Sequence, residues 1–176
     1  MAKKSTHFIV QAGLIAALYA ALTLLQNTLL PGSTSAAVQF RVAEVLTILA
    51  LYTPAAISGL TLGCVIANIS SLSVLGPWDM IFGSLASLLA AVLIYLLRNV
   101  RFFSLPVLAA LMPALANGIL VGLEIDILDG GFELLSFLAF GGCVALGELG
   151  VLLILGLPFT RIIEKTQLDK NILSLK

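Results

Sequence analysis

The sequence predicts an all-α, polytopic membrane protein whose single domain spans residues 1–176. Hydrophobic residues make up 60% of the chain and charged residues only 10%, whereas soluble domains carry about 25% charged residues. Mean hydropathy is +1.15. Apolar runs of roughly twenty residues recur between short polar segments, which is the pattern of helices that cross a bilayer.

The first expected helix runs from about Phe8 to Leu30, long enough to cross a hydrocarbon core of ~30 Å. The basic segment before it leads to no signal-peptide cleavage site, so we expect this helix to be retained. Ala12, Ala16 and Ala20 form a smooth stripe along it, on which another helix can approach closely. The stripe has two interpretations: packing within this chain, or docking on a separate membrane subunit.

The stretch from Arg41 to Ser70 is thirty residues long, too long for one span and short for two. Charge topology favours two spans with a reversal near Thr53-Pro54. Only then do all the basic clusters fall on the cytoplasmic side, as the positive-inside rule requires. At least one of these spans must therefore be short or tilted. The clusters are Lys3 and Lys4; Arg98 and Arg101; and Arg161, Lys165 and Lys170.

Three further helices complete the predicted bundle, at about Met80–Leu97, Ser104–Leu123 and Leu134–Leu157. The connection Ser71–Asp79 is expected outside the cell. So is the acidic segment that follows the fifth helix and carries Glu124, Asp126, Asp129 and Glu133. The prediction is a six-transmembrane-helix bundle in the cell membrane, with the N- and C-termini and the charged tail in the cytoplasm.

Several polar side chains lie inside this apolar chain, where an ionisable group usually has a partner or a function. Arg41 and Glu44 are three residues apart, so they could pair with each other at the start of a helix. Alternatively they face a cavity and bind a polar ligand, the guanidinium donating and the carboxylate accepting. Glu148 lies between Gly147 and Gly150 and is expected to line the same solute site, with a structural carboxyl as the alternative.

The remaining candidates have equally plain structural alternatives. Asn68 and Asn117 either contact a solute or bridge helices. Trp78 is placed where interfacial aromatics anchor helices, and its alternative role is to stack on a flat ring. Asp79 is expected to cap the fourth helix, although it is a further solute-contacting candidate. The two cysteines of the chain, Cys64 and Cys143, have small neighbours and indicate packing residues.

The sequence lacks the motifs of several function classes. No GxxxxGK[ST] loop is present, so the chain carries no ATPase of that kind. No cluster of His and Cys with metal-ligand spacing and no nucleophile motif is found, so neither a cofactor, a metal ion nor an enzymatic activity is expected. Nine basic and nine acidic residues cancel, which gives no indication of nucleic-acid binding.

The segment Val38–Ala91 resembles one transporter family closely. It carries in order the elements QFRVAE, YTPAA, GCVIAN and DMIFGSLA, and together with the alanine-striped first helix these are similar to the QueT family. Members of that family are proposed queuosine-precursor transporters and S-components of energy-coupling-factor (ECF) transporters. The similarity extends over nearly the whole chain.

The resemblance implies a substrate-binding subunit that takes up its solute from the extracellular side. It implies docking, through the first helix, on a transmembrane coupling subunit that works with two ATPase subunits. The expected solute is a 7-deazaguanine such as queuine or 7-aminomethyl-7-deazaguanine. The alternatives are an S-component for another vitamin or purine-like solute, a stand-alone carrier or channel, and a purely structural membrane subunit.

Overall fold

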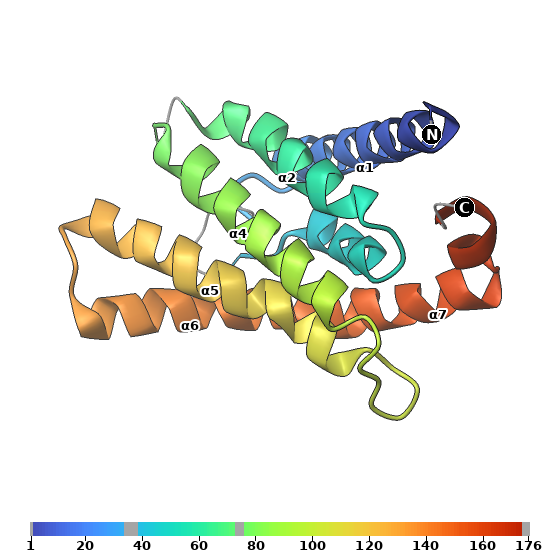
Figure 1. Cartoon of the computed structure of the whole chain (residues 1–176). Coiled ribbons are helices and arrows are strands. Elements are labelled where there is room, and N and C mark those ends of the chain that lie inside the picture. The colour runs from blue at the N-terminus through green and yellow to red at the C-terminus, as the bar shows by residue number, and fades with distance from the viewer. Residues whose placement is uncertain (1, 34–38, 73–75, 174–176) are drawn as a thin grey trace.

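The computed structural model describes residues 2–33, 39–72 and 76–173, and within these ranges it consists of helices joined by turns and short loops, with no strand. Four long helical stretches and a short central hairpin make up the bundle (Figure 1). The elements in order are α1 (Ala2–Leu29), the 3₁₀ helix η1 (Val42–Leu51), α2 (Ala55–Asn68), the 3₁₀ turn η2 (Ile69–Ser71), α4 (Trp78–Leu96), α5 (Val107–Asp129), α6 (Leu134–Val151), the π-helical η3 (Leu152–Gly156), α7 (Leu157–Lys165) and the π-helical η4 (Asp169–Leu173).

The prediction for the end of the fifth helix is wrong. An acidic connection was expected after Leu123, but α5 continues as helix to Asp129. The reason is burial: Glu124 and Asp126 are only 3% and 1% exposed, and the Asp126 carboxylate accepts a hydrogen bond from the Glu133 backbone at the turn that follows. Only residues 130–133 connect α5 to α6. The predicted α1, α4 and α6 are confirmed to within a few residues at most ends, α1 beginning earlier, at Ala2.

The hairpin predicted between Arg41 and Ser70 is present, and its first arm is the 3₁₀ helix η1. Eight of the ten η1 residues are buried, with α1, α2, α4, α5, α6 and α7 around them. A 3₁₀ helix rises ~2.0 Å per residue, so ten residues reach ~20 Å where an α-helix would reach ~15 Å. The stretched geometry lets a short segment run along most of the bundle.

Contacts with α1 fix the length of this arm. Near one end, the Gln26 side chain accepts a hydrogen bond from the Val42 backbone N–H at 2.9 Å. At the other, the Thr53 hydroxyl donates to Gln11 Oε1 at 2.9 Å. Gln11 and Gln26 are ~22 Å apart along α1. The segment from Val42 to Thr53 covers this distance and runs antiparallel to α1. The reversal at Thr53-Pro54 is thereby confirmed.

The alanine stripe of α1 packs against α2 within the chain. An added Cβ on Gly59 would lie 2.8 Å from the Ala12 carbonyl oxygen, and one on Gly63 would lie 2.9 Å from that of Ala16. Ala12, Ala16 and Ala20 are each only 6–7% exposed. The two backbones approach this closely because small residues meet glycines. These alanines therefore pack within the chain, which was the first of the two interpretations of the stripe.

Glycines also bring α5 and α6 into backbone contact. A Cβ on Gly122 would come within 2.5 Å of the Gly141 Cα, and one on Gly118 within 3.0 Å of the Gly141 carbonyl oxygen. This pairing leaves no room for side chains between the helices at that level. Beyond it, α6 continues through η3 into α7 as one helical stretch from Leu134 to Lys165.

The segments that carry the basic clusters lie at one end of the bundle. The two termini and the connection between α4 and α5 lie at one end, and the α5–α6 turn lies at the other (Figure 1). At the first end Arg101 pairs with Glu164 at 2.7 Å, and the Tyr52 hydroxyl donates to the same carboxylate at 3.1 Å. The basic clusters thus share one end, as charge topology predicted.

Four helical stretches are long and apolar enough to cross a membrane: Ser5–Leu29, Trp78–Leu96, Val107–Asp129 and Leu134–Lys165. The hairpin arms, Val42–Leu51 and Ala55–Ser71, are apolar but shorter. Both arms of the predicted hairpin are therefore short, where the sequence required only one to be. The count of six spans and the cytoplasmic side of the termini stay predictions.

Candidate solute-binding site

Arg41 is held in an extended backbone (φ −89°, ψ 99°) immediately before η1. The Gln26 side-chain amide donates to the Phe40 carbonyl and to Ser33 Oγ, and its oxygen accepts from Val42. On the opposite side the Gln39 backbone lies against Gly147 of α6, where a Cβ would be only 3.0 Å from the Gln39 carbonyl carbon. These contacts direct the guanidinium into the bundle, where Arg41 is 4% exposed.

Glu44 lies in the first turn of η1 and is fully buried. The Tyr19 hydroxyl of α1 donates to its Oε1 at 2.5 Å, while its Oε2 has no hydrogen-bond partner among the described residues. An ion pair between Arg41 and Glu44 was one of the two alternatives for these residues, and among the described residues they make other contacts instead. Arg41 precedes the helix, and its side chain does not share the helical face with Glu44. The ion pair that forms is Arg41–Asp79, at 3.5 Å.

Asp79 does not cap α4, and that prediction is wrong. Pro77 occupies the cap position and makes no side-chain capping bond, while Asp79 lies one residue inside the helix. Its carboxylate accepts a hydrogen bond from Ser71 Oγ at 2.5 Å besides pairing with Arg41. Asn68 of α2 donates to the Asp79 carbonyl oxygen at 2.8 Å and so bridges two helices, which was one of its two predicted roles.

Asn117 and Glu148 form a polar contact between α5 and α6. Asn117 Nδ2 donates to Glu148 Oε2 at 2.8 Å, and both side chains are buried. The second oxygen of each, Asn117 Oδ1 and Glu148 Oε1, has no partner among the described residues. The charge of Glu148 interacts with those of Glu44 and Arg41, so these groups belong to one cluster.

Within the described residues, the Arg41 guanidinium pairs with one buried carboxylate, that of Asp79, and interacts electrostatically with three more buried carboxyl groups. Glu44, Asp79, Glu124 and Glu148 are each at most 5% exposed. A buried carboxylate that lacks donors loses several kcal/mol of hydration free energy without compensation. The cluster is therefore rich in acceptors and poor in donors, and it favours a ligand that brings N–H donors or a positive charge.

Trp78 is the one solute-binding candidate named from the sequence that lies outside the buried cluster in the structure. Trp78 is 48% exposed, and its ring contacts that of Phe82 with centroids 6.3 Å apart. Such exposure is typical of an interfacial anchor.

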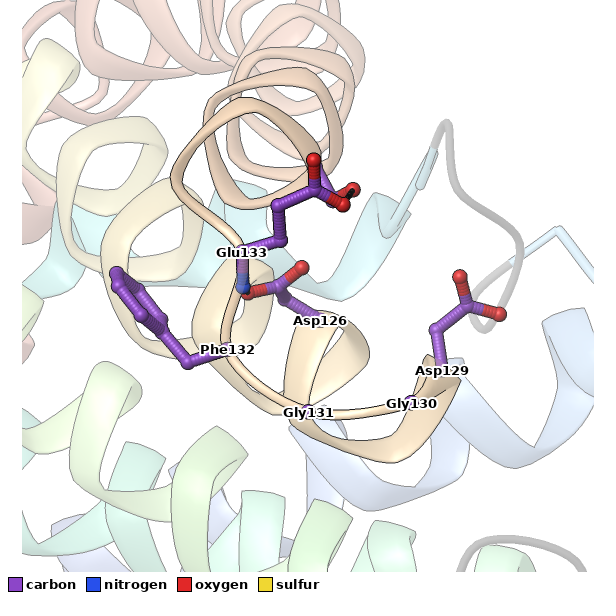
Figure 2. Close-up of a pocket in the computed structure, with 7 residues that line it drawn as sticks. Asp126, Asp129, Gly130, Gly131, Phe132 and Glu133 are labelled. Carbon is purple, nitrogen blue, oxygen red and sulfur yellow. Dashed lines mark hydrogen bonds between the residues drawn. The ribbon is translucent and has the colours of Figure 1, made fainter.

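A cavity of about 320 Å³ opens at the α5–α6 turn (Figure 2). There Asp126 points toward the backbone N–H of Glu133 and accepts from it at 3.0 Å. No group of residues able to hold a metal ion is found in the described parts of the chain.

Sequence reasoning missed three contributors to the cluster: Tyr19, Gln26 and Glu124. A signal for the first two existed, because Gln11, Tyr19, Thr23 and Gln26 recur at helical spacing and mark a polar face on α1. All four are buried in the structure. No comparable signal existed for Glu124. The acidic residues near the end of α5 suggested a loop, and the Glu124 side chain points inward only because the helix continues past it to Asp129.

Helices of membrane-spanning length around a buried, acidic polar cluster define a polytopic membrane protein with a polar site between its helices. The sequence model of the QueT transporter family matches residues 9–165, nearly the whole chain, so the chain belongs to this family. QueT is a family of ECF S-components, and the chain is accordingly a multi-pass transport protein of the cell membrane. A search of curated proteins and a search of solved structures gave no match.

Proposed function

We propose that this chain is the substrate-binding S-component of an ECF-type importer and binds a queuosine precursor, a 7-deazaguanine, on the extracellular side. The observation that carries the proposal is a set of buried acceptors that have no hydrogen-bond partner among the described residues. These are Glu44 Oε2, Glu148 Oε1 and Asn117 Oδ1. Family membership supplies the substrate class, and the acceptors supply a chemical reason for it.

The ligand ring fits this set of acceptors in chemical terms. A 7-deazaguanine carries an N1–H and an exocyclic amine side by side, and a carboxylate such as Glu44 or Glu148 can accept both. The arginine fork that commonly recognises guanine uses O6 and N7, but a 7-deaza ring lacks the N7 acceptor. Arg41 is also engaged by Asp79. The carboxylates, rather than Arg41, are therefore the main recognition groups.

The test is a binding titration of the purified protein with queuine and 7-aminomethyl-7-deazaguanine. We expect at least one of them to bind with a Kd below about 1 μM, and Glu44→Gln to weaken that binding. Glu133→Gln is the matched control, because Glu133 is exposed at the α5–α6 turn. Binding of neither compound contradicts the substrate assignment, and unchanged binding by Glu44→Gln contradicts the role of that residue.

Coupling to an ATPase module is the second part of the proposal. The alanines first considered for docking pack against α2, so a coupling subunit would meet the exposed face of α1 that lies beside them. That face carries a second set of small residues, Gly13, Ala17 and Ala21, which are exposed, and a Cβ on Gly13 would have no neighbour within 4 Å. Small exposed residues at this spacing suit close packing with a partner helix.

Reconstitution in proteoliposomes tests the coupling. With the coupling subunit and the ATPases, we expect ATP-dependent uptake, and without them binding but no sustained uptake. Ala17→Leu should abolish uptake and association while leaving solute binding intact. Ala12→Leu is the contrasting variant, and it should disturb the α1–α2 contact and lower stability. Sustained uptake by the chain alone favours a stand-alone carrier instead.

A further inference from the structure

Glu124 is the most incompletely paired buried glutamate in the part of the chain that the structure describes. It lies on the inner face of α5 and is 3% exposed. Neither of its oxygens has a hydrogen-bond partner there, whereas Glu44, Asp79 and Glu148 each accept at least one hydrogen bond. A carboxylate so buried is costly unless a donor or a cation reaches it.

Glu124 lies further along α5 than Asn117, one of the acceptors assigned to the ligand ring. Asn117 and Glu124 are seven residues apart, so they lie on the same face of α5, two turns and ~10 Å apart along the axis. The Asn117 end holds Glu148 at 2.8 Å. At the Glu124 end, the charge of Glu124 interacts with those of Asp79 and Arg41. The cluster thus has an inner layer and an outer layer.

Arg41 cannot compensate both layers. Its guanidinium pairs with Asp79 at 3.5 Å, and its charge also interacts with Glu44, Glu124 and Glu148. One positive charge faces four buried carboxyl groups. The outer layer therefore retains an acid that a cation from another source would neutralise.

We propose that Glu124 forms a subsite for a protonated amine on the ligand, and that it selects 7-deazaguanines with an aminoalkyl arm over those with a neutral substituent. This inference rests on the proposed function. When the donor edge of the ring lies on the inner acceptors, the substituent on the far side of the ring points along α5 toward Glu124. A fused two-ring base with a one-carbon arm is of comparable length to the separation of the two layers.

The test compares three ligands that share one ring: 7-deazaguanine, 7-cyano-7-deazaguanine and 7-aminomethyl-7-deazaguanine. The wild-type protein should bind the aminomethyl compound most tightly. Glu124→Gln should weaken that binding by about 10- to 100-fold, the range expected for a hydrogen bond to a charged group. Binding of the other two compounds should change less than about threefold. Asp129→Asn, an exposed acid on the same helix, is the control and should change none of the three.

The outcomes separate the subsite from the proposed function. If the wild-type protein binds none of the three compounds, the proposed function fails and the subsite fails with it. If the wild-type protein binds the ring but Glu124→Gln weakens the binding of all three compounds equally, or of none, only the subsite is overturned. A dependence of binding on Na⁺ that Glu124→Gln abolishes also overturns it, because an inorganic cation then occupies the position.

A stability measurement distinguishes a binding role from a structural one. Glu124→Gln removes an uncompensated buried charge, so the ligand-free protein should be as stable as the wild type or more stable. A structural carboxyl would give the opposite result. Should Glu124→Gln fail to fold, Glu124→Asp replaces it. That variant keeps the charge but shortens the side chain by one methylene group, so it should weaken the binding of the aminomethyl compound alone.

Discussion

Replacing Gly147 by alanine adds one methyl group, which should disturb the binding site more than it disturbs the rest of the fold. An alanine Cβ there would overlap the carbonyl oxygen of Gln39 and lie 3.0 Å from that residue's carbon and nitrogen. Ordinary contacts begin at 3.4 Å, and backbone atoms cannot rotate away as a side-chain end can. The segment leading into Arg41 must therefore move off α6.

The expected magnitude follows from two opposing effects. Overpacking a close contact costs about 1–3 kcal/mol, whereas replacing glycine by alanine inside a helix gains up to about 1 kcal/mol. Gly147→Ala should accordingly lose about 1–2 kcal/mol of unfolding free energy. Because Gln39 is two residues from Arg41, the shift should also weaken solute binding at least about tenfold.

Unfolding in detergent with increasing SDS measures the first effect, and ligand titration measures the second. Gly150→Ala is the matched control: it lies three residues further along α6, and a Cβ there has no neighbour within 4 Å. It should be neutral or slightly stabilising and should bind solute normally. If the two variants behave alike, the close approach of Gln39 to α6 does not hold Arg41 in place, and the reasoning is refuted.

Two further predictions concern the contacts of α1. Tyr19→Phe removes the 2.5 Å hydrogen bond to Glu44 and should lower the unfolding free energy of the ligand-free protein by about 1.5–3 kcal/mol. Tyr95→Phe is the control, because Tyr95 of α4 contacts Arg98 through its carbonyl oxygen and its ring; an equal loss in both variants would contradict the role of the Tyr19 hydroxyl. Gln26→Leu removes the acceptor of the Val42 N–H, so amide hydrogen exchange at Val42 should accelerate while exchange within α5 stays unchanged. Unaltered exchange at Val42 would show that other contacts hold this segment.

Much of the architecture was predictable because membrane folding follows simple patterns. Apolar length gave the long helices, and the distribution of Lys and Arg gave the hairpin reversal at Thr53-Pro54, since thirty residues could not otherwise place every basic cluster at one end. The site was predictable in part. Intramembrane charges identified Arg41, Glu44 and Glu148 as members, because such groups are costly and seldom lie in lipid. Their partners were not predictable.

The pairing depended on geometry that no local pattern encodes. Arg41 and Glu44 are three residues apart, which in an α-helix would have joined them, but the helix begins after Arg41 and is 3₁₀. Arg41 therefore reaches Asp79, and Glu44 reaches Tyr19. In the same way, the sequence shows Gly147 and Gly150 as equivalent neighbours of Glu148, and only packing reveals that Gln39 lies against the first.

The sequence by itself determined the class of protein, the long membrane helices and the residues too polar for lipid, because hydrophobicity and charge act residue by residue along the chain. The tertiary structure alone decided which face of α1 is covered, that α5 carries Glu124 inward, and which buried oxygens lack partners among the described residues. These features arise where helices distant in sequence meet, and there a shift of one residue in a helix end changes which side chains point at one another.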